Sequence, residues 1–227
     1  MPIDYTKRPQ RTGAPQPATG GVSLSKVTLT KSAPTVSLTK QGTTGGILRV
    51  NLNWSSRPSD GRGGFFSKHE PPIDLDLGCL YEFADGKRGV VQALGNAFQA
   101  AVSGAPRATI WLDGDDRSGS NAAGENLFIN LEHAAEIRRV LIFAYIYQGV
   151  PNWAAANGVV TLYPPSGPQI EVHLDEPRQG ARTCAIALLA PSDGDLSVRR
   201  EVRYIEGTQA QLDAAYGWGI RWSAGSK

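Results

Sequence analysis

Four carboxylates fall within one loop-like stretch of this sequence, between the strand-like segments 108–112 and 126–131. These four residues are Asp113, Asp115, Asp116 and Glu125. The loop between them is rich in Gly, Ser and Asn and includes Asn121. Carboxylate, amide and backbone oxygens are the hard ligands that Ca²⁺ prefers, and such a loop is flexible enough to place several of them around one ion. The stretch therefore indicates either a calcium-type site or a solvated acidic turn.

A shorter acidic element, Asp74-Leu75-Asp76, is the expected companion of this loop. From 73 to 83 the odd positions are apolar or aromatic, which is the period of a strand with one face on a core. The two aspartates then share the other face, with Cα atoms about 6 to 7 Å apart, so both side chains could reach one ion.

Other chemistries find less support in the sequence. Counting from Asp113, the sixth residue is Ser118 and the twelfth is Gly124, whereas a helix–loop–helix calcium site needs Gly and Glu there. A general acid and base, such as Asp116 with Glu125, would make the protein a hydrolase. This alternative stays open, although no His or nucleophile is visibly paired with either carboxylate.

Familiar cofactor signatures are absent from the sequence. His69, His133 and His173 lack metal-ligand spacing, and neither a phosphate-binding loop nor a dinucleotide fingerprint occurs. The five tryptophans are expected to serve packing, so no specific nucleic acid partner is predicted.

Length and composition favour one large all-β domain. The chain has 227 residues, of which 41% are hydrophobic, with 26 Gly and 15 Pro to supply turns. No run approaches the roughly 20 apolar residues of a membrane span, and the N-terminus lacks the apolar centre of a signal peptide, so we expect a cytoplasmic protein. Cys79 and Cys184 lie in apolar strand-like runs and are expected to be reduced and buried.

The pattern of elements predicts an antiparallel β-sandwich of about ten strands with one or two short helices. A short repeat of alternating apolar and polar residues within Val22 to Lys40 predicts edge-strand hairpins. Asp85-Gly86 predicts a hairpin turn, and the apolar run 138–147 predicts a central strand covered on both faces. Further strands are expected at 47–54, 89–94, 158–163, 170–174, 183–190, 196–205 and 216–222. Short helical turns are expected at 96–102 and 132–137, and Thr208 with Gln211 has the spacing of a capping box that opens a two-turn helix.

Residues 1–21 form a predicted flexible basic tail ahead of a domain over 22–227. Residues 1–50 carry seven Lys or Arg against one Asp, a net charge of +6, so the remainder of the +2 chain is at −4. A basic arm of this kind can dock an anionic membrane or an acidic partner. A metal-independent scaffold that uses this arm is therefore an alternative to the calcium hypothesis.

Several motifs together resemble the TerD superfamily of bacterial tellurium-resistance and stress proteins, and its TerA branch in particular. The motifs shared with the superfamily are Val36-Ser-Leu-Thr-Lys40, Ile73-Asp-Leu-Asp-Leu77, Gly114-Asp-Asp-Arg-Ser-Gly119 and Gly124-Glu-Asn-Leu-Phe-Ile-Asn-Leu131. The stretches that resemble the TerA branch are Val91 to Asn96, Phe143 to Tyr147 and Val159 to Pro165. The likeness covers about residues 22 to 226 in a consistent order.

This resemblance implies a non-enzymatic calcium-binding β-sandwich that acts in tellurium resistance and stress response. It also implies work with other Ter-family proteins, including a membrane-embedded partner, either in the cytoplasm or peripheral to the inner face of the membrane. The metal ligands it implies are Asp74, Asp76, Asp115, Asp116 and Glu125, with Asp113 and Asn121 in support.

The sequence departs from the family pattern at three acidic positions. The closing Asp-Asp-Glu of the family falls on Ala123, Gly124 and Glu125, and the acidic residue that usually follows the early Trp is here Ser55. Fewer charged ligands lower calcium affinity. The expectation is therefore one ion, or weak binding.

Overall fold

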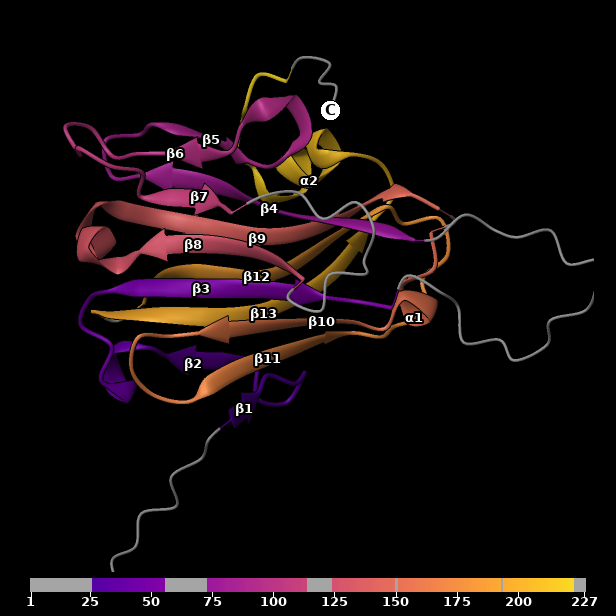
Figure 1. Ribbon diagram of the computed structural model, residues 1–227, viewed down its shortest axis with the longest axis horizontal. Helices are drawn as coiled ribbons and strands as arrows, with labels where there is room; N and C mark the ends of the chain where they lie inside the picture. The colour runs from indigo at the N-terminus through magenta and orange to yellow at the C-terminus, as the bar shows by residue number, and fades with distance from the viewer. Residues whose placement is uncertain (1–25, 56–72, 114–123, 150, 193, 223–227) are drawn as a thin grey trace, which may run out of the picture.

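The computed structural model is a sandwich of two β-sheets, and it describes residues 26–55, 73–113, 124–149, 151–192 and 194–222. Figure 1 shows the strands of both sheets following the long axis of the view, with α2 beside β4. The predicted all-β sandwich is confirmed. The described part of the chain contains thirteen strands, which is more than the ten expected.

One sheet has seven strands and one has six. The order in the seven-stranded sheet is β1 (Lys26–Thr28), β11 (Gln169–Leu174), β10 (Gly158–Tyr163), β3 (Ile47–Asn53), β8 (Glu125–Asn130), β7 (Ile110–Leu112) and β6 (Gln99–Ala100). The order in the six-stranded sheet is β2 (Thr35–Ser37), β13 (Asp195–Ile205), β12 (Thr183–Ser192), β9 (Ile137–Gln148), β4 (Asp74–Phe83) and β5 (Arg88–Val91).

Short helices complete the fold. The α-helices are α1 (Trp153–Ala156) and α2 (Gln209–Tyr216), and the 3₁₀ turns are η1 (Thr39–Gln41), η2 (Leu94–Asn96) and η3 (Leu131–Glu136). The predicted capping box at the start of α2 is present, because Thr208 and Gln211 exchange side-chain and backbone hydrogen bonds. Within the described residues, no helix is long and apolar enough to cross a bilayer.

Two apolar clusters hold the sandwich together, and β4 belongs to both. Its odd positions, such as Leu75 and Leu77, enter the main core between the sheets, together with both buried free cysteines. Leu80, on the other face, joins Leu141, Phe143 and the two residues Leu212 and Trp218 in a second cluster. The predicted alternation of β4 is therefore correct, and its even face is buried as well.

The central strand and the Asp85-Gly86 turn were predicted correctly. Strand β9 lies between β12 and β4, and its middle residues are buried. β4 pairs with β5 in antiparallel register, and Asp85 stabilises the turn by accepting a 2.9 Å hydrogen bond from the backbone N–H of Lys87.

The expected hairpins over residues 22–40 are wrong. β1 joins the seven-stranded sheet in parallel with β11, whereas β2 joins the six-stranded sheet beside β13. The repeated apolar and polar alternation suits any edge strand, so it carries no information about which sheet receives each copy. The predicted helical turn at 96–102 is also wrong, because η2 ends at Asn96 and β6 occupies Gln99–Ala100.

The expected final strand at 216–222 is wrong, because two glycines and the side chain of Asp213 give this segment another backbone conformation. Gly217 and Gly219 both have positive φ, which breaks the extended backbone. The carboxylate of Asp213, at 4% exposure, accepts hydrogen bonds from the backbone N–H groups of Gly219 at 2.6 Å and Ile220 at 2.8 Å. It also accepts one from Trp222 Nε1 at 2.7 Å. These three hydrogen bonds, which we call the Asp213 clasp, hold residues 217–222 across the outer face of the six-stranded sheet.

Replacing Asp213 with Ala should lower the free energy of unfolding by about 2 to 4 kcal/mol, because three donors lose a charged acceptor in a largely buried place. Urea unfolding followed by tryptophan fluorescence measures this. The control is Asp195→Ala, which removes a surface ion pair with Lys40 and should cost less than about 1 kcal/mol. Equal costs for the two variants would contradict the proposed role of the clasp.

Candidate metal centre

Three of the predicted ligands are buried carboxylates at the same end of the sandwich. Asp74 and Asp76 stand at the start of β4 with exposures of 5% and 6%, and Glu125 opens β8 with 3%. Burying one ionised carboxylate is costly, and burying three near one another adds mutual repulsion. Such an arrangement is typical of a site that is built for a cation.

Glu125 links the two sheets at this point. Its Oε2 atom accepts a 2.6 Å hydrogen bond from the backbone N–H of Leu77, although β8 and β4 belong to different sheets. The donor is available because β5 pairs with β4 only from Cys79 to Glu82, and no other strand of the described residues pairs with this edge of β4. The bond places the Glu125 carboxylate one residue from Asp76.

The acidic loop is anchored where it leaves and rejoins the seven-stranded sheet. The Asp113 carboxylate accepts hydrogen bonds from Asn126, at 3.2 Å from the backbone N and 2.8 Å from Nδ2. The backbone N–H of Asp113 in turn donates to the Asn126 carbonyl at 3.2 Å. Asp113 therefore ties the end of the segment after β7 to the start of β8.

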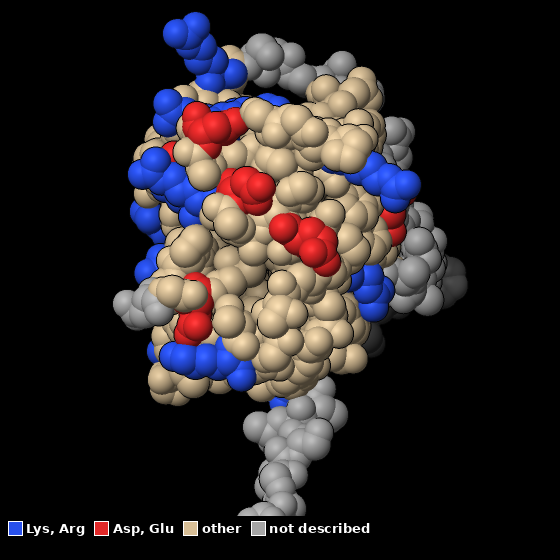
Figure 2. All heavy atoms as spheres, turned by 90° about the vertical axis from the view of Figure 1, so that its left-hand side faces the viewer, with Lys and Arg blue, Asp and Glu red and all other residues tan. Residues whose placement is uncertain are grey.

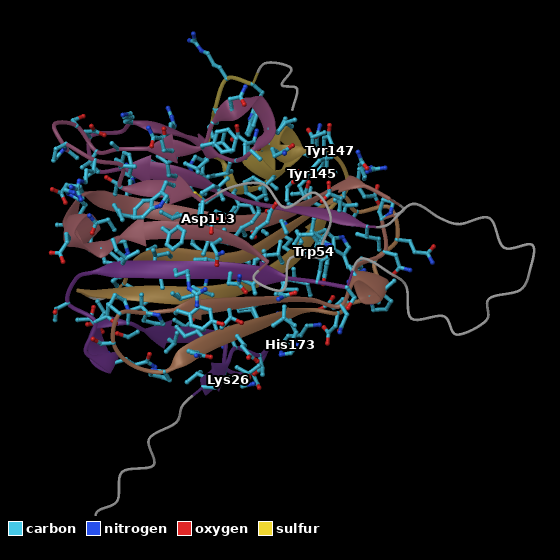
Figure 3. All side chains as sticks on the ribbon, viewed as in Figure 1. Lys26, Trp54, Asp113, Tyr145, Tyr147 and His173 are labelled. Carbon is cyan, nitrogen blue, oxygen red and sulfur yellow. The ribbon has the colours of Figure 1, made fainter. Side chains whose placement is uncertain are left out.

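The segment that precedes β4 is anchored in a similar way. Trp54 Nε1 donates a 3.0 Å hydrogen bond to the carbonyl of Ile73, which joins the two ends of residues 56–72. On the other side of β4, Asp76 lies opposite Tyr145 in the register with β9. Figure 3 shows Trp54 and Asp113 on the same view of the sandwich, with Tyr145 and Tyr147 near the end of β9.

Asn126 is a site residue that the sequence analysis missed. Its Oδ1 atom accepts hydrogen bonds from Asn51 Nδ2 at 3.0 Å and from Arg49 at 3.4 Å. The guanidinium of Arg49 also lies 4.0 Å from the ring centre of Tyr163. The signal was the presence of two Asn residues in each of β3 and β8, which is unusual for strands because Asn has low β propensity.

Gly124 explains one departure from the expected carboxylate pattern. It has a φ of +63°, and a Cβ at this position would overlap the backbone carbonyl of Leu52 on β3. An aspartate here would need both an unfavourable backbone conformation and a separation of β3 from β8. The local backbone is therefore built for glycine.

Not all of the predicted ligands can be placed. Asp115, Asp116 and Asn121 lie outside the described residues, so of the predicted ligands the structure describes only Asp74, Asp76, Asp113 and Glu125. Among the residues that are described, no group of three or more His, Cys, Asp or Glu side chains is arranged to hold a metal ion by itself. A metal centre at this end would therefore need ligands from residues 114–123.

The histidines that are described have local partners. His133 lies 3.9 Å from Glu136, and His173 lies 3.5 Å from Glu171, which also pairs with Lys26 at 3.0 Å. Figure 3 shows Lys26 and His173 well away from Asp113. His69 is outside the described residues.

Fold and site together define a two-sheet β-sandwich that gathers buried carboxylates from both sheets beside an acidic loop. The chain is 49% identical over 208 residues to the tellurium resistance protein TerA of an Alcaligenes species. This match covers 91% of the chain and 60% of the length of that relative. The chain is therefore a relative of the tellurium resistance protein TerA over nearly all of its own length.

Solved structures share the fold. A homologue of the telluride resistance protein TerD from Streptomyces coelicolor superposes with a TM-score of 0.54 at 22% identity, over 79% of this chain and 100% of that one. A protein of unknown function superposes with a TM-score of 0.55 at 16% identity, over 78% of this chain and 99% of that one. No family model matches the chain.

Replacing Gly124 with Ala should lower the free energy of unfolding by about 3 kcal/mol or more, because the new Cβ adds a collision with Leu52 to the cost of a positive φ. The control is Gly86→Ala, since Gly86 also has a positive φ but nothing within 4 Å of an added Cβ. That variant should cost about 1 to 2 kcal/mol. Chemical denaturation compares the two, and equal losses would show that the close approach of β3 adds nothing.

Proposed function

We propose that this protein is a non-enzymatic, calcium-binding member of the tellurium-resistance family that serves as a scaffold or sensor for other Ter proteins. The observation that supports calcium binding is the burial of Asp74, Asp76 and Glu125 at one end of the sandwich, where the acidic loop begins. The similarity to TerA supports the role in tellurium resistance. The chain spans 60% of the matched relative, so the activity of that whole protein enters here only as part of the proposal.

The chemistry of the donor set fits Ca²⁺. The three described carboxylates supply only hard oxygen ligands, and neither cysteine belongs to this end because both thiols are buried in the core. Burial raises the pKa of the Cys79 thiol well above its usual range, which keeps it protonated and unsuited to metal binding. When bound, the ion would offset the repulsion among carboxylates that come from the two sheets.

The role of each side chain follows from its position. Asp76 pairs in register with Tyr145 of β9, and Asp74 pairs with Gln148 across an irregularity in the ladder between Asp74 and Leu75. Glu125 is held by the N–H of Leu77 through one oxygen, and Asp113 orients the loop through Asn126. Asp115, Asp116 and Asn121 would complete the ligand set from the loop. Ligands from strands together with ligands from a loop suit the variable coordination of Ca²⁺.

A cross-strand row on the seven-stranded sheet supports the scaffold part of the proposal. Trp111, Phe128, Arg49 and Tyr163 are neighbours in register across β7, β8, β3 and β10, and all four are half-buried. Aromatic residues and Arg are the residue types that are enriched in protein interfaces. The other sheet covers its outer face with α2 and Trp218. We therefore place the surface for another Ter protein on the seven-stranded sheet.

Calcium titration of chelator-treated protein by calorimetry tests the metal site. We expect saturable binding to the full chain, and a loss of affinity of at least about tenfold in Asp74→Asn/Asp76→Asn, because charged ligands set calcium affinity. Glu125→Gln should also weaken binding while it keeps an oxygen for the Leu77 N–H. Calcium at about 100 times its Kd should raise the free energy of unfolding by about 2.7 kcal/mol.

The matched control is Glu136→Gln/Asp195→Asn, which removes the same charge from the opposite end of the sandwich, where Ile137 of β9 pairs with Phe83 and Asp195 pairs with Ser192. That double variant should bind calcium as the full chain does. No binding heat and no calcium-dependent stabilisation in the unmodified protein would refute the proposal. Equal loss of affinity in both double variants would point to net charge and would refute the assigned ligands.

A further inference from the structure

A pocket of about 670 Å³ lies on the opposite half of β4, where the edges of the two sheets meet. β5 is the edge strand of the six-stranded sheet and β6 that of the seven-stranded sheet, and the two lie beside each other in Figure 1. Tyr81, Lys87, Gln99 and Arg107 supply its polar side chains, and Ala and Pro residues of the connection from β6 to β7 form the rest of the wall.

The polar lining of this pocket consists of positive charges and hydrogen-bond donors. It contains Lys87 and Arg107 and no carboxylate, whereas a second pocket of about 580 Å³ on β13 includes Glu176, Glu201 and Glu206. The end of the molecule in Figure 2 likewise carries acidic and basic side chains interspersed. The unbalanced charge is therefore a local property of this pocket.

The acidic residue nearest in sequence to Lys87 has hydrogen-bond partners of its own. Asp85, in the turn between β4 and β5, accepts hydrogen bonds from Ser103 Oγ at 2.6 Å and from the backbone N–H of Lys87 at 2.9 Å. These bonds hold the pKa of Asp85 below its usual range. Asp85 is fully exposed to solvent, which screens its effect on the pocket.

The Lys87 side chain is held by one hydrogen bond and has further donors for a ligand. Its Nζ donates a 2.8 Å hydrogen bond to the carbonyl of Ala101, which leaves two of its three N–H groups for a ligand. Arg107 is exposed and forms no ion pair or hydrogen bond with any other described residue. Its planar guanidinium offers five donors in a geometry that suits oxyanions.

Tyr81 adds a hydroxyl to the wall. The residue is 8% exposed and lies across Gly89 of β5, its partner in register, where an added Cβ would be 2.7 Å from the hydroxyl oxygen. Among the described residues, no group hydrogen-bonds to this hydroxyl, and its oxygen is accessible from the pocket, so it can donate to a ligand. Burial raises the pKa of Tyr81, so the group stays protonated and acts as a donor at neutral pH.

We propose that this pocket is a binding site for a small inorganic oxyanion, held by Lys87, Arg107 and the Tyr81 hydroxyl. Phosphate and the oxyanions of tellurium share the chemistry required, which is negative charge on oxygen atoms that accept several hydrogen bonds. The site is independent of the proposed calcium centre, because none of its residues belongs to that ligand set.

Titration of ¹⁵N-labelled full chain with inorganic phosphate at low ionic strength tests the site, with a second titration using tellurite. We expect saturable amide shifts at Tyr81, Lys87 and residues 99–108. Lys87→Gln/Arg107→Gln should weaken binding at least about tenfold, since hydrogen bonds to charged groups are strong. Tyr81→Phe, which keeps the ring over Gly89, should weaken it about three- to tenfold.

The charge-matched control is Lys40→Gln/Arg199→Gln, whose side chains are exposed and pair with acids elsewhere. It should bind phosphate within about twofold of the unmodified protein, because exposed pairs contribute little at a distance. Shifts that fail to saturate, or an equal loss in this control, would overturn the proposal. Saturable binding of tellurite but not of phosphate would support it and identify the anion.

Discussion

Both faces of β4 are buried, and two different parts of the chain cover them. The odd face packs into the core between the sheets, and the even face is covered by α2 and Trp218. Trp218 is positioned by Arg139, whose guanidinium lies 3.8 Å from the indole and which also binds Glu82 at the end of β4. A strand that is covered on both sides cannot carry exposed carboxylates. Asp74 and Asp76 are accordingly buried, at 5% and 6% exposure, although they lie at the other end of β4 from Leu80, where Trp218 packs.

Sequence patterns correctly predicted the parts of this fold that depend on interactions between residues close together in the chain. The alternation of β4, the Asp85-Gly86 turn and the capping box at Thr208 each depend on residues within a few positions of one another, and each was predicted correctly. The assignment of β1 and β2 to different sheets depends on contacts across the whole molecule. The loss of a strand at 216–222 depends on a nearer residue, but nothing in the sequence around Asp213 indicates that its carboxylate will bind three donors of the last segment.

In the candidate metal centre, too, the local features could be predicted and the long-range contacts could not. Asp74 and Asp76 could be paired from the strand period, and Glu125 could be chosen from the loop. The contact that brings Glu125 to β4 was not predictable, because it depends on the free edge that β5 leaves at Leu77. Asn126 was missed because a strand asparagine looks like an ordinary surface residue until its partners on β3 and at Asp113 are seen. Gly124 was counted as a lost ligand, whereas its backbone shows why a side chain is excluded there.

The two proposed sites use opposite halves of β4 and opposite kinds of side chain. Seven residues separate Asp74 from Tyr81, which places their Cα atoms about 23 Å apart along an extended strand. That distance is more than twice the Debye length of about 8 Å at physiological ionic strength, so charge at one site is largely screened from the other. A coupling between them would have to pass along the pairing of β4 with β9, which is continuous from Leu75 to Glu82 and shifts register at either end. The sites are therefore expected to bind their ions independently, and the loss of one leaves the case for the other intact.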